Sequence, residues 1–93
     1  MSSDVEELTI QYEENGEVKV EELEKVVIQR GVWATVLFRY RDRNNKTGEW
    51  NKPKAALRRY RKMGGFYRKQ DAVNISERSA PLLVAKLSEW FEV

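Results

Sequence analysis

Side chains alternate in character along residues 33–43, and this alternation constrains the fold more than any other feature of the chain. The even positions are apolar, and the odd positions end in three arginines. The apolar set is Ala34, Val36, Phe38 and Tyr40, and the arginines are Arg39, Arg41 and Arg43. Because successive side chains of a β-strand point to opposite faces, the pattern predicts a strand with one buried face and one basic face.

Further strand signals lie before this segment. Leu8–Tyr12 alternates with period two, and Asn15-Gly16 is a strong signal for a tight hairpin. Val18–Val20 is the predicted start of the return strand, and Val26–Ile28 is β-branched and strand-like. Glu21–Lys25 fits either a continuation of that strand or a helical turn.

Residues 53–63 fit two structures. As a helix, the segment has Pro53 at its first position, Gly64 at its end and one apolar stripe opposite a basic side. The stripe consists of Ala56, Leu57, Tyr60 and Met63. We favour the helix because this stripe is continuous.

As strands, the same segment forms a hairpin that turns at Gly64-Gly65. That register places Arg58 opposite Asp71 and Lys62 opposite Tyr67. Either structure presents a basic surface.

The chain is expected to end in strand followed by helix. Phe66–Lys69 and Ala72–Ile75 indicate strand, and a helix follows that Ser76 or Ser79 can cap. Its apolar face has to be buried on the sheet, on a partner subunit or on both. The face consists of Leu83, Val84, Leu87, Trp90 and Phe91, of which Leu83, Leu87, Trp90 and Phe91 form the predicted dimer interface. The expected fold is α+β: a twisted antiparallel sheet with a C-terminal amphipathic helix packed on it and a short helix at 53–63.

The 93 residues predict one domain over 8–93 after a disordered acidic leader at 1–7. The chain has no Cys and no His, which excludes disulfides, thiolate nucleophiles and imidazole acid–base chemistry and leaves only carboxylates to bind a metal. We therefore expect a non-catalytic protein without cofactor or metal. No apolar run approaches the roughly 20 residues that span a bilayer, so we expect no membrane contact and a cytoplasmic location.

Charge is strongly segregated along the chain. Residues 1–29 contain nine acidic and two basic residues, whereas residues 30–71 contain thirteen basic and three acidic residues. Basic residues and aromatic residues are interleaved within the second block. Basic side chains neutralise phosphates, and aromatic rings stack on unpaired nucleobases. The combination therefore favours single-stranded nucleic acid over duplex. The predicted binding residues are Trp33, Arg39, Arg41, Arg43, Trp50, Lys52, Lys54, Arg58, Arg59, Arg61, Lys62, Tyr67, Arg68 and Lys69.

The sequence is compatible with three alternatives. The acidic residues 1–24 can fold back over the basic face and weaken binding. The segregated surfaces can instead dock a protein of opposite charge. RNA is not excluded as the ligand, because recognition of the 2′-hydroxyl depends on geometry.

The order of these features resembles the single-stranded DNA-binding domain of the positive cofactor four family of transcriptional coactivators. The matching pieces are Val36–Tyr40, Thr47–Lys54, Val73–Arg78 and the helix through Leu87, within residues 26–92. About fifteen residues, from Ala55 to Lys69, stand where the family has only a few. The resemblance implies a homodimer assembled through the C-terminal helices, with curved sheets that bind single strands. It implies binding roles for Arg39, Arg41, Lys52 and Lys54.

Overall fold

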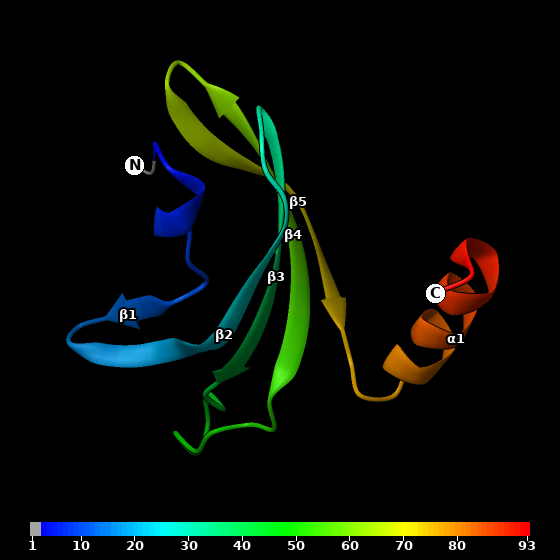
Figure 1. The fold of residues 1–93 in the computed structure, drawn as a ribbon. Coiled ribbons are helices and arrows are strands. Elements are labelled where there is room, and N and C mark those ends of the chain that lie inside the picture. Colours follow the sequence, from blue (N-terminus) through cyan, green and yellow to red (C-terminus); the bar gives the residue numbers. More distant parts are fainter. Residues whose placement is uncertain (1–2) are drawn as a thin grey trace.

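The computed structural model describes residues 3–93, which form one curled antiparallel sheet and a separate C-terminal helix (Figure 1). The strands follow one another in the sheet in the order β1-β2-β3-β4-β5. The elements are η1 (Val5–Glu7), β1 (Tyr12–Glu14), β2 (Glu17–Gln29), β3 (Trp33–Asp42), β4 (Lys54–Met63), β5 (Phe66–Ile75) and α1 (Ala80–Phe91). The α+β class is confirmed.

The alternation of β3 positions the core. Ala34, Val36 and Phe38 are fully buried on one face, which we call the inner face, and Val5, Leu8 and Ile10 of the N-terminal segment are buried with them. In Figure 1 this segment and α1 lie on opposite sides of the sheet. The face opposite the N-terminal segment is called the outer face.

The prediction of a disordered leader at 1–7 is wrong for the part of it that the structure describes. Val5 is buried in a turn of 3-10 helix that Asp4 caps. The Lys25 ammonium also donates hydrogen bonds to the carbonyl oxygens of Val5 (2.9 Å) and Glu6 (2.8 Å). One apolar side chain and two backbone acceptors hold an otherwise acidic segment in place. Residues 1–2 lie outside the described part of the chain.

The first hairpin turns at Asn15-Gly16 as predicted, with positive φ at both residues. Strand β1 is shorter than expected and shares only Tyr12 with the predicted Leu8–Tyr12 strand, since Leu8 and Ile10 enter the core from outside the sheet. Glu21–Lys25 belongs to β2, which runs through two register shifts without a helical turn.

The favoured helix at 53–63 is wrong, because this segment is strand β4. Ala56 and Tyr60 pair with Phe38 and Ala34 of β3 and share their buried face. Pairing with β3 on one side and β5 on the other satisfies the backbone without a helix.

The β4–β5 hairpin turns at Gly64-Gly65, and Lys62 lies opposite Tyr67 as the strand alternative predicts. A bulge between Arg59 and Tyr60 shifts the remaining register. Asp71 therefore lies opposite Arg59 rather than Arg58.

Helix α1 begins after Ser79, with Pro81 in its first turn. It has no extensive contact with any strand of the described chain, and none of its residues is buried. The expected packing of this helix on the sheet of its own chain is therefore wrong. Its apolar stripe is open to solvent, with Trp90 67% and Phe91 69% exposed.

Candidate nucleic-acid interface

The strand register arranges the outer face in rows that run across the strands, because directly paired residues of an antiparallel sheet share a face. A central row is entirely apolar, and polar or charged rows flank it. The apolar row consists of Val26, Leu37, Leu57 and Val73, and we call it the Val26 row. On one side lie Gln29, Thr35, Arg59 and Asp71, followed by Trp33, Arg61 and Arg68; on the other lie Glu24, Arg39, Ala55 and Ile75, followed by Glu21 and Arg41.

At one end of the outer face, arginines surround the indole ring of Trp33. We call this group the Trp33 cluster and define it as Trp33, Arg59, Arg61 and Arg68. The guanidinium carbons of Arg59 and Arg61 lie 4.6 Å and 5.4 Å from the centre of the Trp33 ring. Asp71 accepts hydrogen bonds from Arg59 at 2.6 and 2.9 Å. Arg61 and Arg68 are paired with each other, and no carboxylate of residues 3–93 forms an ion pair with either.

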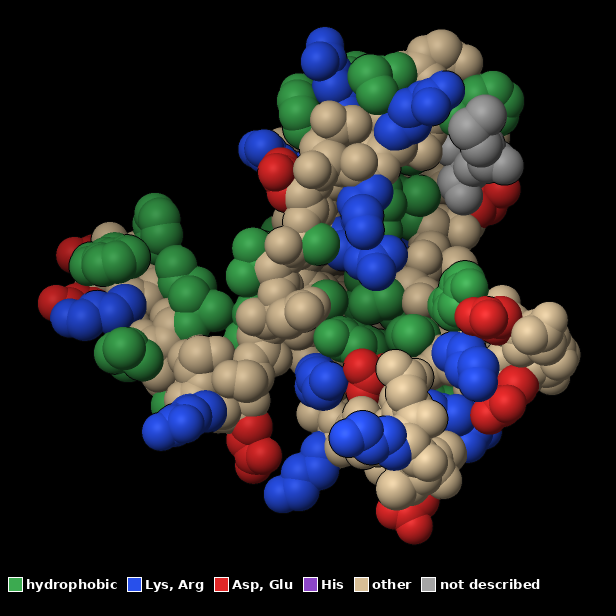
Figure 2. Space-filling view, turned by 180° about the vertical axis from the view of Figure 1, so that it is seen from behind, with side chains coloured by type: hydrophobic (Ala, Val, Ile, Leu, Met, Phe, Trp, Pro, Cys, Tyr) green, Lys and Arg blue, Asp and Glu red, His purple; other side chains and the backbone are tan. Residues whose placement is uncertain are grey.

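The other end carries the Trp50 cluster of Trp50, Arg41 and Arg43. Both guanidinium carbons lie over the indole ring, at 4.2 Å for Arg41 and 4.1 Å for Arg43. Glu21 accepts a hydrogen bond from Arg41 at 2.6 Å, so this charge is neutralised in part. The Trp50 cluster is therefore more self-contained than the Trp33 cluster. Figure 2 shows Lys and Arg side chains at both ends of the sheet and also near its middle.

Arg43 is fixed by the backbone as well as by the ring. Its guanidinium donates to the carbonyl oxygens of Val18 and Gly48, each at 2.8 Å, and Glu17 lies 3.4 Å away. Two segments, the start of β2 and the loop between β3 and β4, thus hold this side chain in one orientation.

The predicted cations do not share one face. Arg39, Arg41, Arg59, Arg61 and Arg68 lie on the outer face, as their pairing shows. The inner-face positions, by the same criterion, are Lys54, Arg58, Lys62 and Lys69. Lys52 precedes β4 and is exposed. The convergence expected of the whole basic block is therefore wrong, because neighbours on a strand point to opposite faces.

Tyr67 is not the free ring that the sequence indicates. Its hydroxyl donates a 2.6 Å hydrogen bond to the carbonyl oxygen of Gly31, and its ring packs against the core. Trp33, which is 38% exposed, is the better platform for a base.

The N-terminal segment covers the inner face, so it does not mask the arginines of the outer face. Beneath it, the Nε of Arg58 and the hydroxyl oxygen of Tyr60 are buried without a hydrogen-bond partner among residues 3–93. Within the acidic residues 1–24, it is Glu21 of β2 that pairs with an outer-face arginine, Arg41, and Asp71 of β5 pairs with Arg59.

Asp42 organises the loop between β3 and β4, a role that sequence reasoning missed. Its carboxylate accepts hydrogen bonds from Asn51 (3.1 Å) and Lys54 (3.2 Å). Partial burial acts to raise the pKa of Asp42, but these hydrogen bonds and the charge of Lys54 outweigh it and leave the pKa below its ordinary value. Lys54 is consequently committed to the protein rather than free for a ligand.

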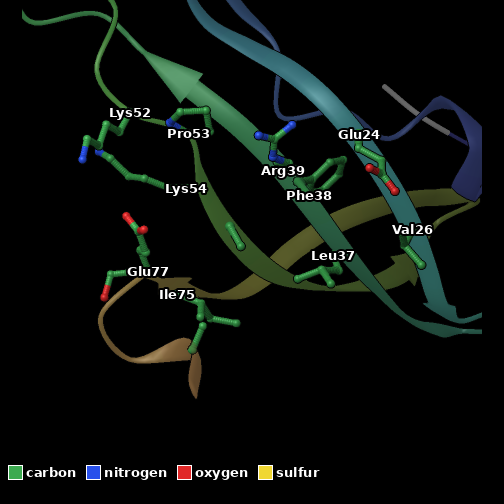
Figure 3. A pocket seen from close by; sticks show the side chains of 13 residues that line it. Glu24, Val26, Leu37, Phe38, Arg39, Lys52, Pro53, Lys54, Ile75 and Glu77 are labelled. Atoms are coloured by element: carbon green, nitrogen blue, oxygen red, sulfur yellow. The ribbon is translucent and has the colours of Figure 1, made fainter. Parts of the chain in front are cut away.

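An open groove of about 670 Å³ lies between the outer face and the start of α1. Val26, Leu37 and Ile75 project into it from three strands, with Arg39 and Lys54 near its rim (Figure 3). The groove is mostly apolar, and Arg39, Lys52 and Lys54 are the cationic side chains of its lining.

Comparison with family models, with curated proteins and with solved structures finds no match to this chain. No helix among residues 3–93 is long and apolar enough to cross a membrane. Within the same residues, no cluster of three acidic side chains is placed to hold a metal ion. The site therefore has to be interpreted from its own geometry.

Proposed function

We propose that the chain is a non-catalytic cytoplasmic protein that binds single-stranded DNA with low sequence specificity and acts as a homodimer. The observation that carries the proposal is the Trp33 cluster, where an exposed indole lies beside two arginines that no acid of the described chain neutralises. RNA remains the alternative ligand, because nothing in this cluster selects for or against a 2′-hydroxyl.

The chemistry of the cluster suits a single strand. Arg61 and Arg68 repel each other at short range, so a phosphate between them removes a repulsion that the free protein carries. The free part of the Trp33 ring can stack on a base, which contributes about 1–3 kcal/mol, and every base has a face to offer. Duplex bases are already stacked on one another and gain nothing from the ring.

A protein-interaction function is the second candidate, and the exposed apolar stripe of α1 favours it. The stripe is explained most simply by contact with another protein surface. In the proposed homodimer this contact and nucleic-acid binding are separate properties of one chain.

Fluorescence anisotropy with matched single-stranded DNA, duplex DNA and single-stranded RNA tests the proposal. We expect the single strands to bind more tightly than duplex, with log K falling against log salt by about 0.7 per phosphate neutralised. Arg61→Ala and Arg68→Ala should each lower that slope, whereas Lys46→Ala, in the exposed turn after β3, is the matched control. Equal binding of duplex, or slopes unchanged in both arginine variants, would overturn the proposal.

A further inference from the structure

Building on the homodimer proposed above, we propose that α1 of a second copy docks across the Val26 row of the outer face, and that the two copies exchange helices reciprocally. The apolar stripe of α1 and the Val26 row are both uncovered, and one chain carries both. The stripe consists of Leu83, Val84, Leu87, Trp90 and Phe91. Reciprocal docking between two copies covers every such surface and closes the assembly with twofold symmetry.

The chain exposes more surface than a monomer of its size should. Its accessible surface is 6979 Å², whereas a folded monomer of 11.0 kDa exposes about 5,600 Å². The excess of roughly 1,400 Å² falls in the range that each partner of a stable, obligate dimer buries, about 1,000–2,500 Å². The radius of gyration of 14.9 Å likewise exceeds the ~12 Å expected for a compact chain of this length.

The two surfaces also match in size. The Val26 row crosses four strands, so its outer members lie three strand spacings apart, about 14 Å. Helix α1 has 12 residues and is about 18 Å long. A helix laid along the row therefore covers it from β2 to β5, with room for its first and last turns beyond the edges.

The polar residues of α1 suit this placement. Helical periodicity places Glu89 on the side away from the stripe, so docking leaves its carboxylate in water. On the sheet, Arg39 and Arg59 border the Val26 row, and the guanidinium of Arg59 is held by Asp71 and lies over Trp33, one row further from the Val26 row.

The chain's own helix starts beside its own row without covering it, and hydrogen bonds fix the turn that leads into the helix. The Ser79 amide bonds to the carbonyl and side-chain oxygens of Ser76, at 3.1 and 3.2 Å, and the Ser76 amide bonds back to the Ser79 hydroxyl at 3.2 Å. The Ala80 amide also bonds to the Ser76 carbonyl at 3.0 Å. Docking of a helix from a second copy leaves every one of these hydrogen bonds in place.

Sedimentation velocity on the full chain tests the proposal, with one variant on each surface. Val73→Lys changes an edge-strand side chain that is 58% exposed, and Leu87→Glu changes one in the exposed stripe, so both should leave the fold intact by circular dichroism. We expect the wild type to be a dimer and each variant to raise the dimer dissociation constant at least 100-fold. Leu82→Glu, on α1 but outside the stripe, is the matched control and should remain dimeric.

Mixing the Val73→Lys and Leu87→Glu variants provides the decisive measurement. A mixed dimer contains one intact helix-on-row contact and one in which the helix and the row carry introduced charges of opposite sign. The mixture should therefore dimerise where neither variant does alone. A monomeric wild type, or a Val73→Lys variant that dimerises like the wild type while Leu87→Glu does not, would overturn helix exchange. The Val73→Lys substitution leaves the Trp33 cluster intact. Fluorescence anisotropy on the same samples therefore tests nucleic-acid binding separately from dimerisation, so failure of the proposed function is distinguished from failure of helix exchange.

Discussion

Arg61 lies directly opposite Arg68 in the pairing of β4 with β5, and Trp33 lies opposite Arg61 on the other side. Like charges in directly opposed positions of a sheet destabilise the fold. We therefore expect Arg68→Ala to leave the free energy of unfolding unchanged or to raise it by about 0.2–1 kcal/mol, while it weakens nucleic-acid binding. Urea denaturation beside anisotropy checks both quantities. A variant that lost stability and binding together would indicate a structural role instead.

Trp33→Ala should weaken single-strand binding by roughly 1–3 kcal/mol with little change in salt slope, because stacking releases no counterions. Trp33→Phe keeps an aromatic face and should recover part of the loss. An anisotropy salt series distinguishes this stacking effect from an electrostatic one, which would change the slope.

Tyr67→Phe tests the reassignment of Tyr67 from ligand platform to structural residue. The variant loses the hydrogen bond to the Gly31 carbonyl and should cost about 0.5–1.5 kcal/mol of stability. Its affinity for single strands should equal that of the wild type. A large loss of affinity with unchanged urea midpoint would return Tyr67 to the binding site.

Ile10→Ala should destabilise the protein by about 2–5 kcal/mol, because Ile10 is only 6% exposed in the core that the N-terminal segment completes. Ile28→Ala removes the same atoms from a side chain that is 58% exposed and serves as its control. Thermal and urea unfolding compare the two. Similar small losses in both variants would mean that the segment contributes little to the core.

Asp42 should make stability depend on pH. A carboxyl whose pKa is lowered by folding stabilises the protein above its unfolded pKa of about 3.9, and that contribution is lost as pH falls through the folded value. Asp42→Asn should therefore be less stable than wild type at pH 7, and the difference should shrink below about pH 4. Urea titrations at several pH values measure this; a difference independent of pH would exclude a role for the charge.

The sequence predicts β3 well, because its alternation is local and one face is wholly apolar. Residues 53–63 are different: Ala56 and Tyr60 lie four apart, a spacing that places both on one face of a helix and also on one face of a strand. Only pairing with β3 and β5, which are distant in the sequence or across a turn, selects the strand. Short-range patterns carry no information about such pairing.

The candidate site was predictable in composition but not in geometry. Arg58 and Arg59 are neighbours in the sequence and lie on opposite faces, so their separation follows only once β4 is known to be a strand. The bulge after Arg59 then decides which of them meets Asp71. The buried Val5 is a single apolar residue among acids, a signal too weak to indicate that its segment belongs to the core.

The simple order of strands in the sheet has a consequence for how the protein forms. Each strand pairs with its predecessor in the chain, so four hairpin closures of modest loop length can build the sheet in succession. The N-terminal segment is synthesised before β3 and β4 but has no surface to cover until these strands have formed. Its docking is therefore the late, long-range event of folding, and a nascent chain has to keep Leu8 and Ile10 from other partners until then.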